Sequence, residues 1–358
     1  MGRLVIAVHL GAGRYGKRLR EHMDDLLRSC IQSGVDAYSQ TKDSVDTVSS
    51  VMTVLEASGL VNTGNGSALT RGHTVECDGI VIRSGDHALG CVIAVPECAN
   101  PTRIATALLK ESTLSLEYGE ILRSCILVGS AAASFASDRS LLHKTEVSSV
   151  QKERGLRYSA ILERRKQCEK RERVSLSTER DASFSTERDA SLPTKRVVSF
   201  STEQDASVTD TVGCIIVTDD EIVVAGSSGG SWMRVSGRGG LCSVPGAGVW
   251  CDETVGVVCS GYGECFIRTL FAREMCEAVR ENREAHVTEG LRRLEKDQQR
   301  MRISLPSCFG LLCCCREENR VRVILSHTSK MMGMGVFDGE RIETRLSEQT
   351  GEECVYYE

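Results

Sequence analysis

"DTVGCIIV", residues 210–217, places an acidic residue and a threonine directly before a run of apolar, mostly β-branched residues. This pattern predicts a buried strand that begins at Thr211. An acidic turn and a second apolar run, "EIVVAGSSGG" (221–230), follow and predict a strand pair. Regular structure is therefore expected to start abruptly at Thr211, which makes the Asp210–Thr211 bond a boundary within the chain.

The segment before this boundary, about residues 144–210, differs from the rest in composition. It contains the charge-dense run "ERRKQCEKRER" (163–173) and then an octapeptide that repeats. The copies are SLSTERDA (175–182), SFSTERDA (183–190), the degraded SLPTKRVV (191–198) and SFSTEQDA (199–206). Units so rich in Ser, Thr, Glu and Arg predict a flexible insertion. The charged run has two open interpretations, a nuclear-import signal or a solvated helix.

The chain before the insertion, about residues 1–143, alternates strand and helix patterns. "LVIAV" (4–8) predicts a short buried strand, and the following "GAG" predicts a tight turn. A helix is expected next, with Gly34 as its stop signal, and a second helix over 44–57. A shaped loop, "NTGNGSAL" (62–69), a hairpin around "SGD" and a helix opened by "NP" at Asn100 complete this part.

The chain from Thr211 to residue 358 repeats this alternation. "TVGVVCSGYGECFIRTLFAREMCEAV" predicts a strand, a glycine-rich turn and a helix that starts near Glu264. A further amphipathic helix is expected over 286–303, and "RVRVILSHTSKMMGMGVF" (320–337) predicts two closing strands. Neighbouring strands that pair, with helices from each half, indicate an α+β fold of antiparallel sheets covered by helices on the outer faces.

Composition limits the class of protein. The chain has 358 residues, of which 41% are apolar, so it can form a substantial core. Its net charge of −5 gives no electrostatic reason to expect binding to nucleic acid or to an anionic membrane. The apolar N-terminal stretch is too short for a signal peptide or a membrane span. The 17 cysteines include no C-x-x-C pair, and we expect reduced thiols, an intracellular protein, and neither metal nor cofactor. "CFGLLCCC" (308–315) is expected to be an apolar strand or loop.

The Asp210–Thr211 dipeptide suggests self-cleavage. The hydroxyl of Thr211 can attack the carbonyl carbon of Asp210, and water can then release the resulting ester. Thr211 would gain a free α-amine, whose pKa of about 7.7–8.0 suits a general base near neutral pH. The alternative is that Thr211 is an ordinary first residue of a strand, since threonine is common there.

Hydroxyl and glycine residues in later segments favour the cleavage hypothesis. Ser228 falls at the end of the paired strand, where its hydroxyl can lie beside that of Thr211. Ser260 and the Gly261 amide stand at a strand-to-helix turn, where donors can stabilise an oxyanion. His9 and His327 are expected to be structural, because an N-terminal threonine brings its own base.

Several short motifs occur together and in one order. They are "HLGAG" (9–13), "NTGNGSAL" (62–69), "VECDG" (75–79), "NPTRIA" (100–105), "DTVG" (210–213), "SSGG" (227–230), "SGRGG" (236–240), "GAGVW" (246–250) and "SGYGECFIRTLFARE" (260–274). In these motifs the chain resembles the plant-type asparaginase family of N-terminal-nucleophile hydrolases. The last motif and "SHTSKMMGMG" (326–335) are closest to its threonine aspartase (taspase) branch. The resemblance covers residues 4–143 and 211–340.

This resemblance implies a four-layer αββα fold cleaved into an α subunit (1–210) and a β subunit (211–358), paired as an (αβ)2 heterotetramer. It also implies roles for individual residues. These are Thr211 as nucleophile, Ser228 as its assisting hydroxyl, Arg238 as the substrate-carboxylate ligand, Ser260 and Gly261 at the oxyanion site, Asn62 beside the nucleophile and Gly11 near the scissile carbonyl. A monovalent ion at the N-terminal glycine loop, held by some members, is left open.

The chain departs from the asparaginase pattern near Arg238. Asparaginases have a carboxylate three positions after this arginine, which binds the ammonium group of a free amino acid; this chain has Leu241 there. An unpaired buried charge costs several kcal/mol, so a free amino acid should bind poorly. This change favours an endopeptidase that cuts protein substrates after an internal Asp, with Arg238 binding the Asp side chain. Ser236 and Gly239 replace the usual Pro and Val, which is expected to loosen this loop.

Three functions are therefore compared. The first is a self-cleaving threonine endopeptidase; the resemblance implies substrates such as transcription regulators and a location in the cytoplasm, the nucleus or both. The second is an L-asparaginase or isoaspartyl peptidase. The third is an uncleaved relative that acts as an interaction protein, against which the presence of Thr211, Ser228, Arg238 and Ser260 argues. No direct contact with nucleic acid or membrane is expected.

Overall fold

The computed structural model describes residues 3–114, 121–182, 211–281, 285–301, 307–318, 320–348 and 351–357. Asp210 lies outside the described residues, as do the last three octapeptide copies (183–206). The expectations for those residues, including the cleavage bond itself, therefore stay predictions.

The described strands form two sheets. The larger sheet has the order β12-β11-β1-β5-β6-β2-β3-β4, and all its neighbours are antiparallel except β3 and β4. Its strands are β1 (Leu4–Gly13), β2 (Glu76–Arg83), β3 (Leu89–Pro96), β4 (Ile126–Val128), β5 (Val212–Thr218), β6 (Ile222–Ser228), β11 (Met331–Phe337) and β12 (Ile342–Ser347). The predicted strand pair after Thr211 is β5 and β6, at the centre of this sheet.

The smaller sheet has the order β13-β10-β9-β8-β7 and is antiparallel throughout. Its strands are β7 (Val249–Cys251), β8 (Val255–Ser260), β9 (Gly310–Arg316), β10 (Val321–His327) and β13 (Gly351–Tyr357). The cysteine-rich run of 308–315 is confirmed as an apolar strand, β9. The two predicted closing strands are present, but β10 lies in the smaller sheet and β11 in the larger one.

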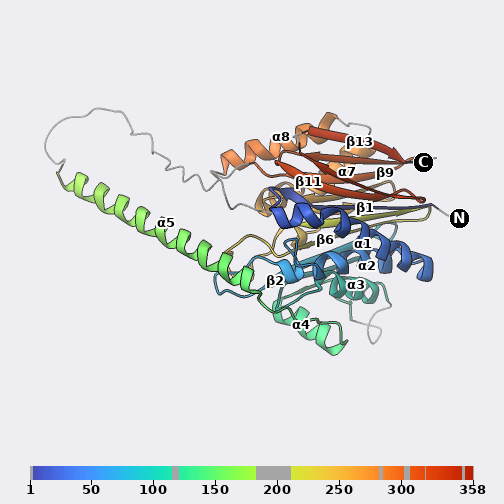
Figure 1. Cartoon of the computed structure of the whole chain (residues 1–358), viewed down its shortest axis with the longest axis horizontal. Helices are drawn as coiled ribbons and strands as arrows, with labels where there is room; N and C mark the ends of the chain where they lie inside the picture. Colours follow the sequence, from blue (N-terminus) through green and yellow to red (C-terminus); the bar gives the residue numbers. More distant parts are fainter. Residues whose placement is uncertain are drawn as a thin grey trace.

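Helices lie on the outer faces of the two sheets (Figure 1). The helices of the described residues, of which α5 projects away from both sheets, are α1 (Lys17–Thr41), α2 (Ser44–Ala57), α3 (Pro101–Ser112), α4 (Gly129–Asp138), α5 (Ser149–Ala182), α6 (Gly263–Thr269), α7 (Phe271–Arg280) and α8 (Ala285–Arg300), with short 3-10 helices η1 (Gly64–Gly66) and η2 (Leu241–Ser243). α1, α2 and α3 contact the larger sheet, whereas α7 and α8 contact the smaller one.

Successive residues of a central strand enter different cores, as the two-residue period of a strand requires. On β5, Ile216 packs with the apolar faces of α1, α2 and α3. Its neighbour Ile215 packs between the sheets, in a core that also contains Met275 of α7 and Leu291 of α8. The α+β class expected from the sequence is therefore confirmed, with sheet packed on sheet and helices outside both.

Two glycines act differently from what the sequence predicts. The "GAG" run does not turn the chain, because Gly11 (φ 96°) forms a bulge and β1 continues to Gly13. Gly34 does not end α1, which continues to Thr41. A Cβ on Gly34 would lie 2.5 Å from a methyl carbon of Val51, so glycine here permits close packing of α1 against α2.

The helix expected near Glu264 is divided in two. α6 begins at Gly263 and ends at Thr269, and α7 begins at Phe271; Leu270 between them adopts a left-handed conformation (φ 49°). The helix expected over 286–303 is present as α8, which ends at Arg300; residues 302 and 303 lie outside the described residues.

The expectation of a flexible segment from about residue 144 is wrong for Ser149–Ala182, which forms α5 and includes the first octapeptide copy. Charged residues with high helix propensity support this helix, as does an ion pair between Glu163 and Lys166 one turn apart. The helix projects from the body of the molecule (Figure 1). Of the two interpretations of 163–173, the structure is consistent with the solvated helix and does not test nuclear import.

The base of α5 is attached to the body. The amide of Gln151 donates to the carbonyl oxygen of Ser67 at 2.8 Å. The ring of Tyr158 stacks on Trp232, with 5.3 Å between ring centroids. Among the described residues, no helix is long and apolar enough to cross a membrane.

Candidate active site

Thr211 directly precedes β5 and is 2% exposed. Val212 pairs with Ser227 of β6, and Gly213 pairs with His9 of β1. One step beyond the Val212–Ser227 pair places Thr211 opposite Ser228. On the other side the pairing ends at Gly213 and His9, and Gly11 lies two residues further along β1, on its bulge. The structure therefore brings Thr211 and Ser228 into one row across the sheet, with Gly11 on the neighbouring strand.

Ser260 approaches the same row from the smaller sheet. A Cβ at Gly256 of β8 would lie 3.0 Å from Ile215, and a Cβ at Gly213 would lie 2.8 Å from Val258. A step of two residues along β8 thus matches a step of two along β5, so the next facing pair is Ser260 and Thr211. Ser260 is fully buried, and its hydroxyl accepts a hydrogen bond from the Ala12 N–H at 2.8 Å.

Gly261 follows at the turn into α6, with φ 145°. A Cβ there would lie 2.6 Å from the carbonyl oxygen of Cys308, so this turn requires glycine. Its predicted oxyanion role is a question of ligand contacts and stays a prediction.

Asn62 fixes the turn that follows Ser228. The backbone carbonyl oxygen of Asn62 accepts a hydrogen bond from the Gly229 N–H at 2.8 Å, and its side-chain amide donates one to the Gly230 carbonyl oxygen at 2.7 Å. The Ser228 hydroxyl accepts from the Gly230 N–H at 3.0 Å. Asn62 thus lies beside the turn that follows β6, next to Ser228, and its expected place beside the nucleophile stays a prediction.

Cys242 is a neighbour of Thr211 that the sequence did not reveal. The thiol of Cys242 forms a hydrogen bond with the side chain of Thr211, which lowers the pKa of the thiol slightly. Burial has the larger effect and holds this pKa well above the ordinary value. The thiol is therefore neutral and contributes to the packing around the hydroxyl of Thr211. No spacing rule connects positions 211 and 242, because η2 and the preceding loop bring them together.

His9 supports the bulge at Gly11. Its Nδ1 accepts from the Gly11 N–H at 3.1 Å, and the Gly11 carbonyl accepts from the Tyr15 hydroxyl at 2.7 Å. Burial lowers the pKa of His9 to about 3, so the imidazole is neutral at physiological pH. His327 is also buried and bonds to Ser347 and Ser329. Both histidines have the kind of contacts expected of structural residues.

Arg238 forms a two-bond ion pair with Glu264. Its Nε donates to Oε1 at 2.9 Å and its Nη2 donates to Oε2 at 2.7 Å. The arginine side chain is 20% exposed and the glutamate side chain 51%. Burial would raise the pKa of Glu264, but the hydrogen bond and charge of Arg238 lower it below the ordinary value. The sequence had marked Glu264 only as a helix start, although it lies within the motif used for the resemblance.

Hydrogen bonds to two carboxylates hold the loop around Arg238. The Ser236 hydroxyl and the Gly237 N–H both donate to the carboxylate of Glu76, the second at 2.9 Å. The Gly240 N–H donates to Asp78 Oδ2 at 2.6 Å. Ser236 therefore supplies a hydrogen bond that a proline could not, and the expected loosening of this loop relative to the asparaginase pattern stays a prediction.

Two further side chains define this part of the site. Asp78, paired across the sheet with Ser228, is 3% exposed, and burial raises its pKa. Leu241 is 2% exposed and packs in the core between the sheets, next to Gly248. Leu241 therefore brings an apolar side chain to the position where the asparaginase pattern has an ammonium ligand.

A buried carboxyl group, Glu56 of α2, lies behind β6. Its Oε1 accepts from the hydroxyl of Ser227 at 2.7 Å and from the N–H and hydroxyl of Thr102 at 3.0 and 2.5 Å. Ser227 also contacts the Thr63 hydroxyl at 2.5 Å. Glu56 thus connects α2 and α3 to the residues adjacent to Ser228 and Asn62. Burial raises its pKa to about 7.

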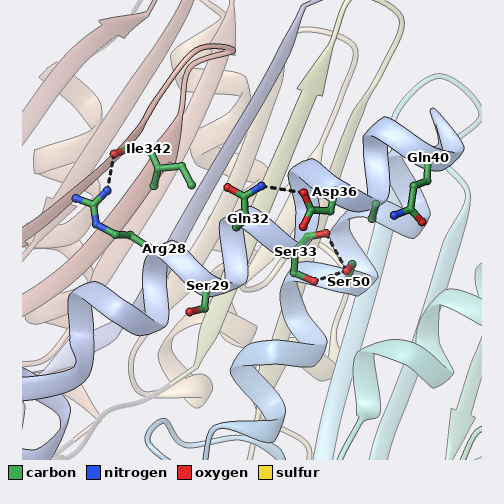
Figure 2. Close-up of a pocket in the computed structure, with 9 residues that line it drawn as sticks. Arg28, Ser29, Gln32, Ser33, Asp36, Gln40, Ser50 and Ile342 are labelled. Carbon is green, nitrogen blue, oxygen red and sulfur yellow. Dashed lines mark hydrogen bonds between the residues drawn. The ribbon is translucent and has the colours of Figure 1, made fainter.

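A pocket of about 770 Å³ lies elsewhere, along the outer face of α1 (Figure 2). It is lined mainly by polar residues, including Arg28, Gln32, Asp36 and Ser50, and by none of the predicted site residues. Within the described part of the chain, no group of three or more His, Cys, Asp and Glu residues could hold a metal ion.

Comparison with known proteins gives one consistent result. A sequence model described as asparaginase matches residues 2–343. The chain is 28% identical to the probable isoaspartyl peptidase/L-asparaginase 2 of Arabidopsis thaliana over 280 residues, 77% of this chain and 80% of the relative. It is 26% identical to the plant-type L-asparaginase of Pyrococcus furiosus (77% and 80% covered) and 27% to the isoaspartyl peptidase of Escherichia coli (77% and 76%). The chain therefore belongs to the plant-type asparaginase family.

Proposed function

We propose that this chain is a self-cleaving threonine endopeptidase of the taspase type, which cuts protein substrates after an internal aspartate. The observation that carries the proposal is the position of Thr211. It stands directly before a central strand and is buried; the strand registers, extended by one step, put Ser228 and Ser260 opposite it, and the bulge with Gly11 is on the neighbouring strand. A threonine with only a structural role would not need three such neighbours from three separate strands.

Activation proceeds by an acyl shift. The Thr211 hydroxyl oxygen attacks the carbonyl carbon of Asp210, the C–N bond breaks, and the nitrogen takes a proton to become the α-amine of Thr211. Water then hydrolyses the ester, which leaves a new carboxylate on Asp210 and restores the hydroxyl. In the mature enzyme this amine takes the hydroxyl proton during attack on a substrate and delivers it to the leaving amine.

The substrate preference rests on Arg238 and Leu241. Arg238 can bind a carboxylate through charge-assisted hydrogen bonds, which are worth about 1.5–3 kcal/mol each in proteins. The apolar Leu241 leaves the ammonium group of a free amino acid without its usual counter-charge, whereas an Asp inside a peptide has no such group. This combination supports a peptide with an internal Asp as substrate.

A second candidate is an L-asparaginase or isoaspartyl peptidase. The names of the relatives support this candidate better than the first. The structure adds one observation in its favour. The carboxylate of Glu264 lies next to Arg238 and is half-exposed, so it could compensate for Leu241 by receiving a substrate ammonium group.

One set of assays separates the two candidates. The purified protein would be incubated with a peptide that contains one internal Asp, with the same peptide carrying Asn, with L-asparagine and with an isoaspartyl dipeptide. We expect cleavage after Asp in the first peptide and little ammonia or free aspartate from the small substrates. Ammonia release from L-asparagine without peptide cleavage would instead establish the second candidate.

Replacement of Arg238 supplies the control for this assay. Arg238→Ala should lower kcat/KM on the Asp peptide roughly 10- to 100-fold, the value of one charge-assisted hydrogen bond. The residual activity on the Asn peptide should change much less. Equal losses on both peptides would mean that Arg238 does not recognise the carboxylate.

The remaining expectations belong to the same proposal. These are the αββα architecture of an N-terminal-nucleophile hydrolase, pairing into an (αβ)2 heterotetramer, and action on regulatory proteins in the cytoplasm or nucleus. The packing of α1, α2 and α3 on the larger sheet and of α7 and α8 on the smaller sheet supports the first of them.

A further inference from the structure

We propose that Cys242 is a positioning residue, whose thiol holds the hydroxyl group of Thr211 in the orientation from which it attacks. This inference rests on the proposed function, because it takes Thr211 as the nucleophile. The hydrogen bond between the two side chains connects the nucleophile to the loop that carries Arg238, four residues earlier in the chain. Neither the motifs nor the names of the relatives assign a role to this cysteine.

The thiol lies on the face of β5 and β6 that packs against the smaller sheet. A Cβ at Gly226 of β6 would lie 2.9 Å from the Sγ atom of Cys242 and 2.6 Å from a methyl carbon of Val249 in β7. Gly226 pairs with Gly213 of β5, and Thr211 stands two residues before Gly213. Because residues two apart in a strand share a face, Thr211 points its side chain toward the same face. Glycine at 226 therefore leaves the space that the thiol occupies beside Thr211.

The backbone around Cys242 is held by several contacts, which fix the position of the thiol. The N–H of Gly240 donates to Asp78 Oδ2 at 2.6 Å, and the carbonyl oxygen of Gly240 accepts from the Ser243 N–H at 3.0 Å. The thiol of Cys91 in β3 donates to the carbonyl oxygens of Cys242 and Ser243, at 3.6 and 3.8 Å. A group that orients a nucleophile must itself be well fixed, and Cys242 meets this requirement.

The chemistry of a neutral thiol suits a positioning role. Burial holds the pKa of Cys242 well above the ordinary value, so the thiol keeps its proton and does not act as a base. A thiol is both a weak donor and a weak acceptor, so it can favour one staggered rotamer of Thr211 and release the hydroxyl when its oxygen attacks. The hydroxyl proton still passes to the α-amine of Thr211, as in the proposed mechanism.

Two substitutions separate the hydrogen bond from packing. Cys242→Ser keeps a donor and an acceptor but is more polar, whereas Cys242→Val is apolar and forms no side-chain hydrogen bond. If the thiol orients Thr211, kcat on the Asp peptide should fall about 10-fold in Cys242→Val and stay within threefold of wild type in Cys242→Ser, with KM little changed in both. If the thiol only fills space, the valine variant should match wild type and the serine variant should be the impaired one. That reversed order would overturn the inference.

A matched control uses Cys251 of β7, which is as fully buried as Cys242 and packs in the same core. Its thiol donates to the carbonyl oxygens of Ile82 and Ile222, at the opposite end of β6 from Ser228. Cys251→Ser and Cys251→Val should change the unfolding temperature about as much as the Cys242 pair and leave kcat unchanged. An equal loss of kcat in the Cys251 pair would show that activity follows stability, and would contradict the positioning role. If Cys242→Val does not fold, Cys242→Ala replaces it, since alanine also lacks a donor and an acceptor.

Self-cleavage gives a second measurement of the same hydroxyl group. A denaturing gel of freshly purified protein should show uncut chain in Cys242→Val and little in Cys242→Ser. Because an uncut chain has no free α-amine at Thr211, kcat is expressed per cleaved chain. A folded Cys242→Val protein that stays entirely uncut also supports the inference, provided that Cys251→Val is cut like wild type.

The outcomes distinguish this inference from the proposed function. If wild type cuts itself but hydrolyses L-asparagine or an isoaspartyl dipeptide instead of the Asp peptide, the endopeptidase proposal fails. The Cys242 variants are then compared on those substrates, because Thr211 is the nucleophile there as well. Equal kcat values for wild type and both variants, on whichever substrate is hydrolysed, would overturn the positioning role alone. A wild type that neither cuts itself nor hydrolyses any of these substrates would overturn both.

Discussion

Glu56 and Glu264 both support the candidate active site, but their carboxyl groups meet contrasting environments. Glu56 is fully buried behind β6, where it bonds to hydroxyl groups and a backbone N–H, and burial raises its pKa to about 7. Glu264 is half-exposed and faces a guanidinium group, which lowers its pKa despite partial burial. The direction of the shift follows from the partners: hydroxyl and backbone N–H groups, which are neutral, around Glu56, and a guanidinium cation beside Glu264.

The contrast suggests a division of roles. Glu56 connects α2, α3 and the ends of two loops, so its role is to keep the framework of Thr211 together. Glu264 is half-exposed and bonds to one side chain, that of Arg238, so we expect its role to concern recognition through that arginine. Framework residues should affect stability when replaced, and recognition residues should affect KM.

The largest expected difference is in stability. Glu56→Ala removes the acceptor of three hydrogen bonds, leaves buried donors of Thr102 and Ser227 unpaired, and opens a cavity; we expect a loss of about 3 kcal/mol or more in the free energy of unfolding. Glu264→Ala should cost less than about 1 kcal/mol, the usual range for exposed pairs. Urea unfolding of both variants at pH 7 measures this, and similar losses would remove the distinction.

A smaller effect concerns the pH dependence of stability. The folded pKa of Glu56, about 7, exceeds its ordinary value of 4.5, so the stability it contributes is complete below pH 4.5 and is lost as pH rises through 7. At about 1.4 kcal/mol per tenfold change in proton affinity, the loss is roughly 3 kcal/mol.

Glu56→Gln cannot ionise and should not show this decline. The variant should therefore become more stable relative to wild type between pH 5 and pH 8, as measured by the difference between their free energies of unfolding. A difference that stays constant over this range would mean that the carboxyl group of Glu56 does not titrate there.

The smallest effect has the opposite sign. The folded pKa of Glu264 lies below its ordinary value of 4.5, so its stabilising contribution is present above that pH and is lost as pH falls through the folded pKa. The difference in unfolding free energy between wild type and Glu264→Gln should be a few tenths of a kcal/mol near pH 7 and should shrink toward pH 3. High salt should reduce it as well, since the pair is partly exposed.

Strand patterns were the most reliable guide to the fold. The pair β5 and β6 follows from two apolar runs around an acidic turn, and the sheet confirms it. The sequence could not predict that β10 and β11 belong to different sheets. Both segments have the pattern of a buried strand, and strands so close in sequence usually pair with each other. Gly34 was wrongly taken as a helix end, since only the approach of Val51 reveals why a glycine stands there.

The candidate site was predicted in part for a similar reason. Thr211, Ser228, Ser260 and Arg238 lie in short motifs whose order along the chain is informative. Cys242 is brought to Thr211 by the path of a loop, which no spacing rule expresses. Glu56 did carry a signal, a lone carboxylate in an otherwise apolar and small-residue stretch of α2, but its partners Thr102 and Ser227 come from distant segments.

The central claim is that the chain cuts itself between Asp210 and Thr211. The most direct test is the intact mass of the purified protein, with a denaturing gel, for wild type and for Thr211→Ala. We predict two wild-type fragments, of residues 1–210 and 211–358, the second starting at Thr211, and one uncut chain for the variant. A wild-type protein that stays a single chain of full length, unaffected by Thr211→Ala, would contradict the account.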